Sequence, residues 1–178
     1  MTYEAFLEGI AARAREHEQR AVSASDGLTS EQFNKPAGKE WSAARVYKHL
    51  CLADEPYLMA IESALSRASA GSGDVKHSFV GKMLMKASGP DGNAPSPAFL
   101  IPPALALSTE VVEEWKRYRA TFLRLIESAR GKDLSVGVKN PFIKFLPMKL
   151  ADLFAVIDVH TERHVRQIEE RSRLARNA

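Results

Sequence analysis

Four stretches of the chain carry apolar side chains at steps of three and four residues, the spacing that buries one side of an α-helix. They cover residues 2–25, 42–65, 108–130 and 147–173. Each stretch is too long for an ordinary strand, and polar residues occupy the positions between the apolar ones. The pattern therefore predicts an all-α fold in which four long helices form a four-helix bundle.

The ends of these stretches carry recognisable boundary residues. Ser42 can cap the first amides of the second helix, and Gly27 and Gly131 follow the first and third helices as stop residues. Pro56 lies inside the second stretch, where it removes one backbone hydrogen bond and crowds the preceding turn. We expect a kink in the helix at Pro56 rather than a break.

The connection over residues 71–107 is rich in glycine and proline, so it cannot form one continuous helix. Its middle, residues 79–86, could form a short helix, and apolar clusters at 79–80, 83–85 and 99–101 favour packing over disorder. A connection this long is usually functional or disordered. We expect it to cover a site or to form a subunit contact.

Composition narrows the class of protein. A chain of 178 residues with 45% hydrophobic and 26% charged residues suggests one globular domain over residues 1–178. No apolar run approaches the ~20 residues of a membrane helix. The single cysteine and the absence of a recognisable signal peptide at the N-terminus favour a cytoplasmic protein.

The charges do not indicate nucleic-acid binding. The net charge of +3, from 25 basic and 22 acidic residues, is too balanced for that partner. Several arginines crowd the last helix, Arg163 and Arg166 among them, but glutamates such as Glu162 interleave with them. Ion pairs on the helix surface explain this pattern better than a basic binding face.

Three histidines carry the most informative chemistry. His160 and His164 are four residues apart, so they share one face of the last helix, and His49 lies in the apolar stripe of the second helix. Three imidazoles that meet in a bundle would form a divalent-metal site with an open coordination position. Such histidines are also common as ordinary core or boundary residues, and spacing alone does not decide between these two readings.

Two segments resemble the DinB/YfiT-like family of metalloenzymes. Residues 38–50, GKEWSAARVYKHL, resemble the family's "EWS…V…HL" entry to its second helix, and residues 150–168 resemble its final "H..RH..QI" helix. The resemblance implies a four-helix bundle with a divalent metal ion held by His49, His160 and His164. Nickel or zinc is expected first, with iron or manganese as alternatives.

The same resemblance indicates the partners. Family members with assigned activities include thiol S-transferases and a mycothiol-dependent isomerase. A small-molecule substrate is therefore expected, in particular a low-molecular-weight thiol, and a homodimer is reasonable for this fold. No nucleic acid and no membrane are expected as partners.

Other polar residues near these positions have two readings each. Gln167 shares the face of His160 and His164, so it either orients a ligand or is a polar residue at the helix boundary. His17 lies on the inward stripe of the first helix. It is either a further metal ligand, a substrate contact or a histidine at the boundary of the core. Asp158 and Glu162 lie ~200° around the helix from His160, which argues against a His-Glu-x-x-His peptidase and leaves the general base unidentified.

Four more residues have simple expected environments. Cys51 lies ~200° around the helix from His49 and is expected to be a small buried residue. Asp54 and Glu55 are expected to face solvent or to cap polar contacts. His77 lies in the long connection and is expected to be exposed.

The sequence thus predicts a metal-dependent enzyme that activates a thiol or a water molecule, for transfer to a small molecule or for its hydrolysis. The main alternative is a non-catalytic, dimerising bundle that binds a metal or a small ligand. A purely structural bundle with incidental histidines would bind no metal at all.

Overall fold

A computed structural model describes residues 1–143 and 145–177 of the chain. The described part is mainly helical, which agrees with the predicted all-α class. The α-helices are α1 (Tyr3–Ser25), α2 (Ser30–Asn34), α3 (Ala43–Leu65), α4 (Phe79–Ser88), α5 (Glu110–Ser128) and α6 (Leu150–Arg176). They are joined by a 3₁₀ turn, η1 (Ala98–Leu100), and by two strands, β1 (Gly137–Lys139) and β2 (Pro147–Lys149).

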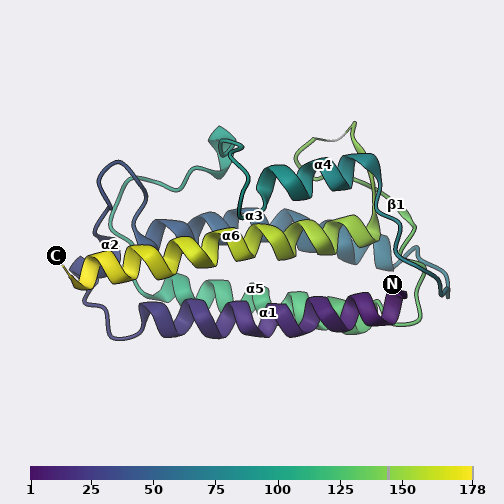
Figure 1. The fold of residues 1–178 in the computed structure, drawn as a ribbon, viewed down its shortest axis with the longest axis horizontal. Coiled ribbons are helices and arrows are strands. Elements are labelled where there is room, and N and C mark those ends of the chain that lie inside the picture. Colours follow the sequence, from purple (N-terminus) through teal and green to yellow (C-terminus); the bar gives the residue numbers. More distant parts are fainter. Residues whose placement is uncertain (144, 178) are drawn as a thin grey trace.

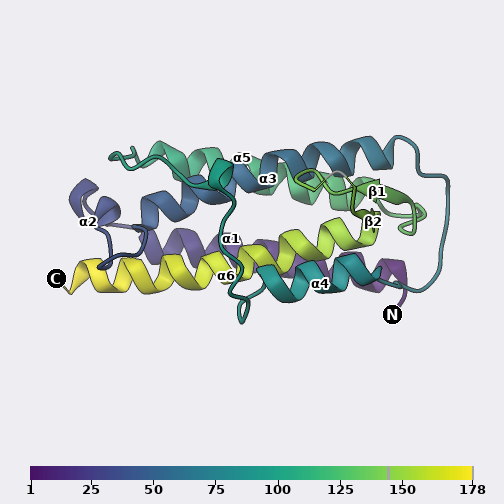
Figure 2. The same cartoon turned by 90° about the horizontal axis from the view of Figure 1, so that it is seen from above.

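The long helices α1, α3, α5 and α6 lie alongside one another (Figures 1 and 2). Both α1 and α3 pack against α5 and also against α6, while α4 lies along α6. Every long helix contributes to two buried apolar clusters. One cluster includes Ile10, Ile61, Phe122 and Phe154, and the other includes Ala21, Leu50, Trp115 and Ile168.

The helix boundaries follow from capping. The Ser42 hydroxyl accepts a hydrogen bond from the Arg45 amide at the start of α3, as the sequence predicted. The helix α3 is continuous through Pro56, so the proline does not break it.

None of the described helices combines the length and the apolar character that a bilayer crossing requires.

The prediction that the last helix begins at Pro147 is wrong by three residues. Residues Pro147–Lys149 instead form β2, which pairs antiparallel with β1 so that Met148 lies opposite Val138. The amides of Leu150 and Ala151 then donate hydrogen bonds to the Val136 and Leu134 carbonyls. These bonds hold the backbone against the segment that precedes β1 up to the point where α6 begins. Strands of three residues carry too little periodicity to show in a sequence pattern.

The predicted short helix within the long connection is present as α4, and a buried carboxylate joins it to α6. Asp152, in the first turn of α6, is fully buried and accepts hydrogen bonds from the amide and hydroxyl of Ser78. It also lies 2.9 Å from Nδ1 of His77. His77 is therefore half-buried, which corrects the expectation that it is exposed.

Candidate metal centre

His49 on α3 and His160 and His164 on α6 point their ring nitrogens at one another. Nε2 of His160 lies 3.3 Å from Nε2 of His49 and 3.1 Å from Nε2 of His164. Nitrogens bound at 2.0–2.1 Å to one tetrahedral ion would be ~3.3 Å apart. The spacing of the three imidazoles therefore fits a single divalent ion.

Hydrogen bonds at the outer nitrogens fix two of these rings. Nδ1 of His49 lies 2.8 Å from the Leu100 carbonyl, and Nδ1 of His164 lies 2.7 Å from Oε1 of Gln167. Both partners are acceptors, so each Nδ1 carries the proton and each Nε2 keeps its lone pair toward the centre. Outer contacts of this kind orient metal-binding histidines and set their tautomer.

The surroundings keep all three imidazoles neutral at pH 7. Burial is the main cause, and it lowers the pKa of His49 and His164 and brings the pKa of His160 to about 3. The nearby guanidinium of Arg163 lowers the pKa of each further. Neutral imidazole is the form that binds metal ions, so the donor set suits a cation without prior loss of protons.

A cavity of about 320 Å³ adjoins the three histidines. This volume is in the range of pockets that hold small molecules. One wall comes from the long connection, including Leu84 on α4 and Pro97, Phe99 and Leu100 around η1. The rest of the lining comes mainly from the segment that follows β1, from α3 and from α6, and includes Ala53, Tyr57, Asn140, Phe142, Ile143, Val156 and Arg163.

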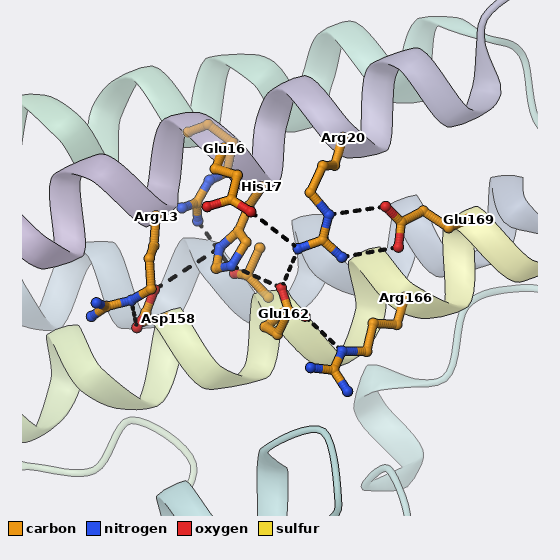
Figure 3. Close-up of polar contacts among 10 residues, drawn as sticks. Arg13, Glu16, His17, Arg20, Asp158, Glu162, Arg166 and Glu169 are labelled. Atoms are coloured by element: carbon orange, nitrogen blue, oxygen red, sulfur yellow. Dashed lines mark hydrogen bonds and ion pairs between the residues drawn. The ribbon is translucent and has the colours of Figure 1, made fainter.

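His17 does not join this group. It lies on α1, where its Nε2 is 3.0 Å from a Glu162 carboxylate oxygen and its Nδ1 is 3.9 Å from Asp158 (Figure 3). Arg13 pairs with Asp158 and Arg20 pairs with Glu162 in the same network. The two carboxylates therefore face α1, on a different side of α6 from the histidine group, as their helical positions predicted.

Asp54 does not face solvent, which rules out the first of the two environments expected for it. It is 2% exposed, and its Oδ2 lies 3.9 Å from Nη1 of the fully buried Arg119 on α5. Burial raises the pKa of Asp54 to about 6, against the opposing effect of Arg119. The guanidinium also lies 4.7 Å from the Phe122 ring centre and 3.4 Å from the Thr161 hydroxyl on α6. Cys51, by contrast, is buried as predicted.

Sequence reasoning missed three further contributors to the cavity. Asn140 donates to the Tyr57 hydroxyl at 3.3 Å, and its Oδ1 accepts from two amides of the loop that follows it. Leu100 acts through its backbone carbonyl, which no side-chain pattern reveals. Arg163 was assigned to surface ion pairs, yet it lines the cavity, and its three-residue spacing from His160 would have placed it on that face.

Fold and site together define a class of protein. It is a helical protein in which two helices bring three neutral histidines to the wall of a cavity of about 320 Å³. The family model of the DinB superfamily matches residues 13–168, and the chain belongs to this superfamily. Comparisons with curated proteins and with solved structures gave no significant match. The family match confirms the resemblance seen in the sequence.

Proposed function

We propose that the protein is a cytoplasmic, divalent-metal-dependent enzyme on a DinB-type four-helix bundle, acting on a small molecule. The observation that carries this proposal is the convergence of three Nε2 atoms, with neighbouring pairs 3.1 and 3.3 Å apart, at the wall of a cavity. Three neutral imidazoles suit nickel or zinc, and iron or manganese are the alternatives.

The chain's own residues hold and shield the site. A bound ion would lower the pKa of a thiol or a water molecule, so that its nucleophilic anion is present near neutral pH. The Leu100 carbonyl and Gln167 fix the ligand rings, while apolar residues of the connection exclude water from one side. The family resemblance favours a low-molecular-weight thiol, which makes S-transfer the preferred reaction and hydrolysis the alternative.

Elemental analysis tests the metal assignment. Protein purified without an affinity tag or chelator is expected to carry about one equivalent of metal, and His49→Ala and His160→Ala are expected to lose it. His17→Gln is the matched control, because this buried histidine contacts Glu162 instead of the group. Circular dichroism checks that each variant is folded. Wild-type metal affinity in His160→Ala, or no uptake by the wild type, would refute the assignment.

A second candidate function is a binding module without catalysis. The observation that favours it is that no aspartate or glutamate occurs among the described residues lining the cavity, so no carboxylate base is at hand. The two functions differ in a screen of thiols against electrophiles with the metal-loaded protein. Turnover supports the enzyme, whereas tight ligand binding without turnover supports the module.

We also propose that the protein forms a homodimer. Phe79 and Met83 support this, because they are one turn apart on α4 and expose 83% and 45% of their surface. Light scattering after gel filtration measures the mass. A dimer that Met83→Glu dissociates is expected, and a monomeric wild type at micromolar concentration would rule it out.

A further inference from the structure

Arg163 occupies a specific place beside the histidine group. It lines the 320 Å³ cavity together with His160 and His164, and it also lines a second, smaller pocket of about 240 Å³ that includes Gln167. Arg163 thus contributes both to a mainly apolar cavity and to a more polar pocket. It is half-buried and close enough to the three imidazoles to lower the pKa of each.

The charge of Arg163 is not neutralised within residues 1–143 and 145–177. Its neighbour Arg166 pairs with Glu162, and Arg171 pairs with Glu170 and Glu40, but Arg163 forms no ion pair with a described residue. The described lining of the 320 Å³ cavity holds no carboxylate either, and Glu40, which lines the smaller pocket, pairs with Arg171. In a half-buried site a lone positive charge attracts an anion strongly, and a divalent cation beside it would strengthen that attraction.

The rest of the cavity is apolar and aromatic. The Phe142 ring lies 5.2 Å from Tyr57, edge to face, and 5.5 Å from Phe99, and Leu84 and Ile143 also contribute to the lining. At about 30 Å³ for each non-hydrogen group, 320 Å³ has room for roughly ten of them. The space fits one aromatic ring or branched chain with a short linker.

We propose that the ligand of this site is a small organic acid, whose carboxylate binds Arg163 and whose apolar body lies against Phe99 and Phe142. A guanidinium presents a planar pair of N–H donors that matches the two oxygens of a carboxylate. The proposal deepens the proposed function, on which it rests, by giving the chemical class of the small molecule. Arg163 is the residue that distinguishes this class from neutral molecules of the same shape.

The test uses phenylalkanoates with one to four methylene groups and, for each, the matching primary amide. Titration calorimetry measures their binding to the full chain in a chelator-treated, metal-free form and in a zinc-loaded form. The variants are Arg163→Met, which keeps the apolar length of the side chain, and Arg163→Lys, which keeps the charge. Arg166→Met is the matched control, since Arg166 is exposed one turn away on the same helix and pairs with Glu162.

At least one acid is expected to bind the wild type more tightly than its amide in both forms. Arg163→Met should weaken that acid roughly ten- to a hundredfold and leave the amide unchanged, because only the acid loses a charge-assisted pair. Arg163→Lys should retain part of the preference, and Arg166→Met all of it. Equal binding of the acid to the wild type and to Arg163→Met, or no preference for any acid, would overturn the proposal.

Metal content measured on the same samples separates the two proposals. If the wild type takes up no metal while the preference for acids still depends on Arg163, the proposed function fails and the anion site stands. If Arg163→Met and the wild type both hold one equivalent of zinc but neither prefers acids, the anion site fails and the metal centre stands.

Discussion

His49 and His164 differ from ordinary buried histidines in what their outer nitrogens contact. Each Nδ1 donates to an oxygen, from Leu100 in one case and from Gln167 in the other, so that the inner lone pairs of both rings point at His160. A neutral His160 carries a single N–H, which at Nε2 would serve two neighbouring lone pairs at once. Two lone pairs directed at the same centre are better explained by a shared cation than by hydrogen bonding alone.

Replacing Gln167 with leucine should weaken metal binding roughly ten- to a hundredfold, because the His164 ring loses the acceptor that fixes its orientation. Competition against a chromophoric chelator measures the affinity. Gln167→Glu keeps an acceptor oxygen at the same place and is expected to bind metal at least as well as the wild type. If the leucine variant matched the wild type, Gln167 would be a boundary residue without a role at the site.

At the residue scale, the sequence predicts those features of a site that depend on the chemical type of a side chain and on its spacing along a helix. Helical spacing placed His160 and His164 on one face and His49 on an inward stripe, the family resemblance named the three as one ligand set, and they do lie together. The buried position of Asp54 was not predictable, because its partner Arg119 belongs to another helix. A carboxylate in isolation favours solvent, and only tertiary packing reverses that preference.

At the scale of elements, the attachment of α4 to α6 forms one wall of the cavity. Gly81, in the first turn of α4, lies directly against the Asp152 carboxylate, and a Cβ at this position would overlap it. Asp152 cannot move aside easily, because it is fully buried and accepts hydrogen bonds from Ser78 and from the Lys149 amide. The close approach of the two helices therefore requires glycine at position 81.

Gly81→Ala is expected to loosen α4 from α6 at a cost of about 1–3 kcal/mol, as other overpacked contacts do. Hydrogen exchange should show lost protection in α4, while α1, α3 and α5 keep theirs. Gly137→Ala is the matched control, because nothing lies near the position of its Cβ. Unchanged exchange in α4 would mean that the carboxylate relocates at little cost.

The extents of the long helices were predictable because many residues repeat the same apolar spacing over several turns. The start of α6 at Leu150 was not predictable from the sequence. Pro147 is a good residue for the first turn of a helix, and it belongs to a strand only because it pairs with β1. Similarly, the short helix at residues 79–86 was predictable from its composition. Its packing against α6 depends on Asp152 and Ser78, which the sequence keeps far apart.

At the scale of the whole molecule, a polar network joins α1 to α6 on a side that the histidine group does not use. His17, Asp158 and Glu162 form its centre, with Arg13 and Arg20 at its edges (Figure 3). Burial lowers the pKa of His17 below its ordinary 6.5, and the charge of Arg119 adds to this effect. His17 is therefore neutral in the folded protein under conditions in which the unfolded chain already binds a proton there.

This difference makes folding sensitive to acid. Below pH 6.5 the unfolded state binds more protons at His17 than the folded state, so the free energy of unfolding falls as the pH falls. His17→Gln removes that contribution. Between pH 7 and pH 5 the metal-free wild type should lose more stability than the variant, by at most about 2 kcal/mol. Urea unfolding at several pH values measures it, and parallel profiles would show that His17 titrates normally.

The outer acceptor of His49 is a backbone carbonyl, and this has a consequence for evolution. The hydrogen bond uses only the backbone oxygen of Leu100, so it places no demand on the side chain at that position, which is constrained instead by its place in the cavity wall. What selection must preserve is the path of the chain between α4 and α5, which carries the carbonyl to within 2.8 Å of the ring. Insertions or deletions there would move the carbonyl and disturb the ring of His49, even where the three histidines themselves are unchanged.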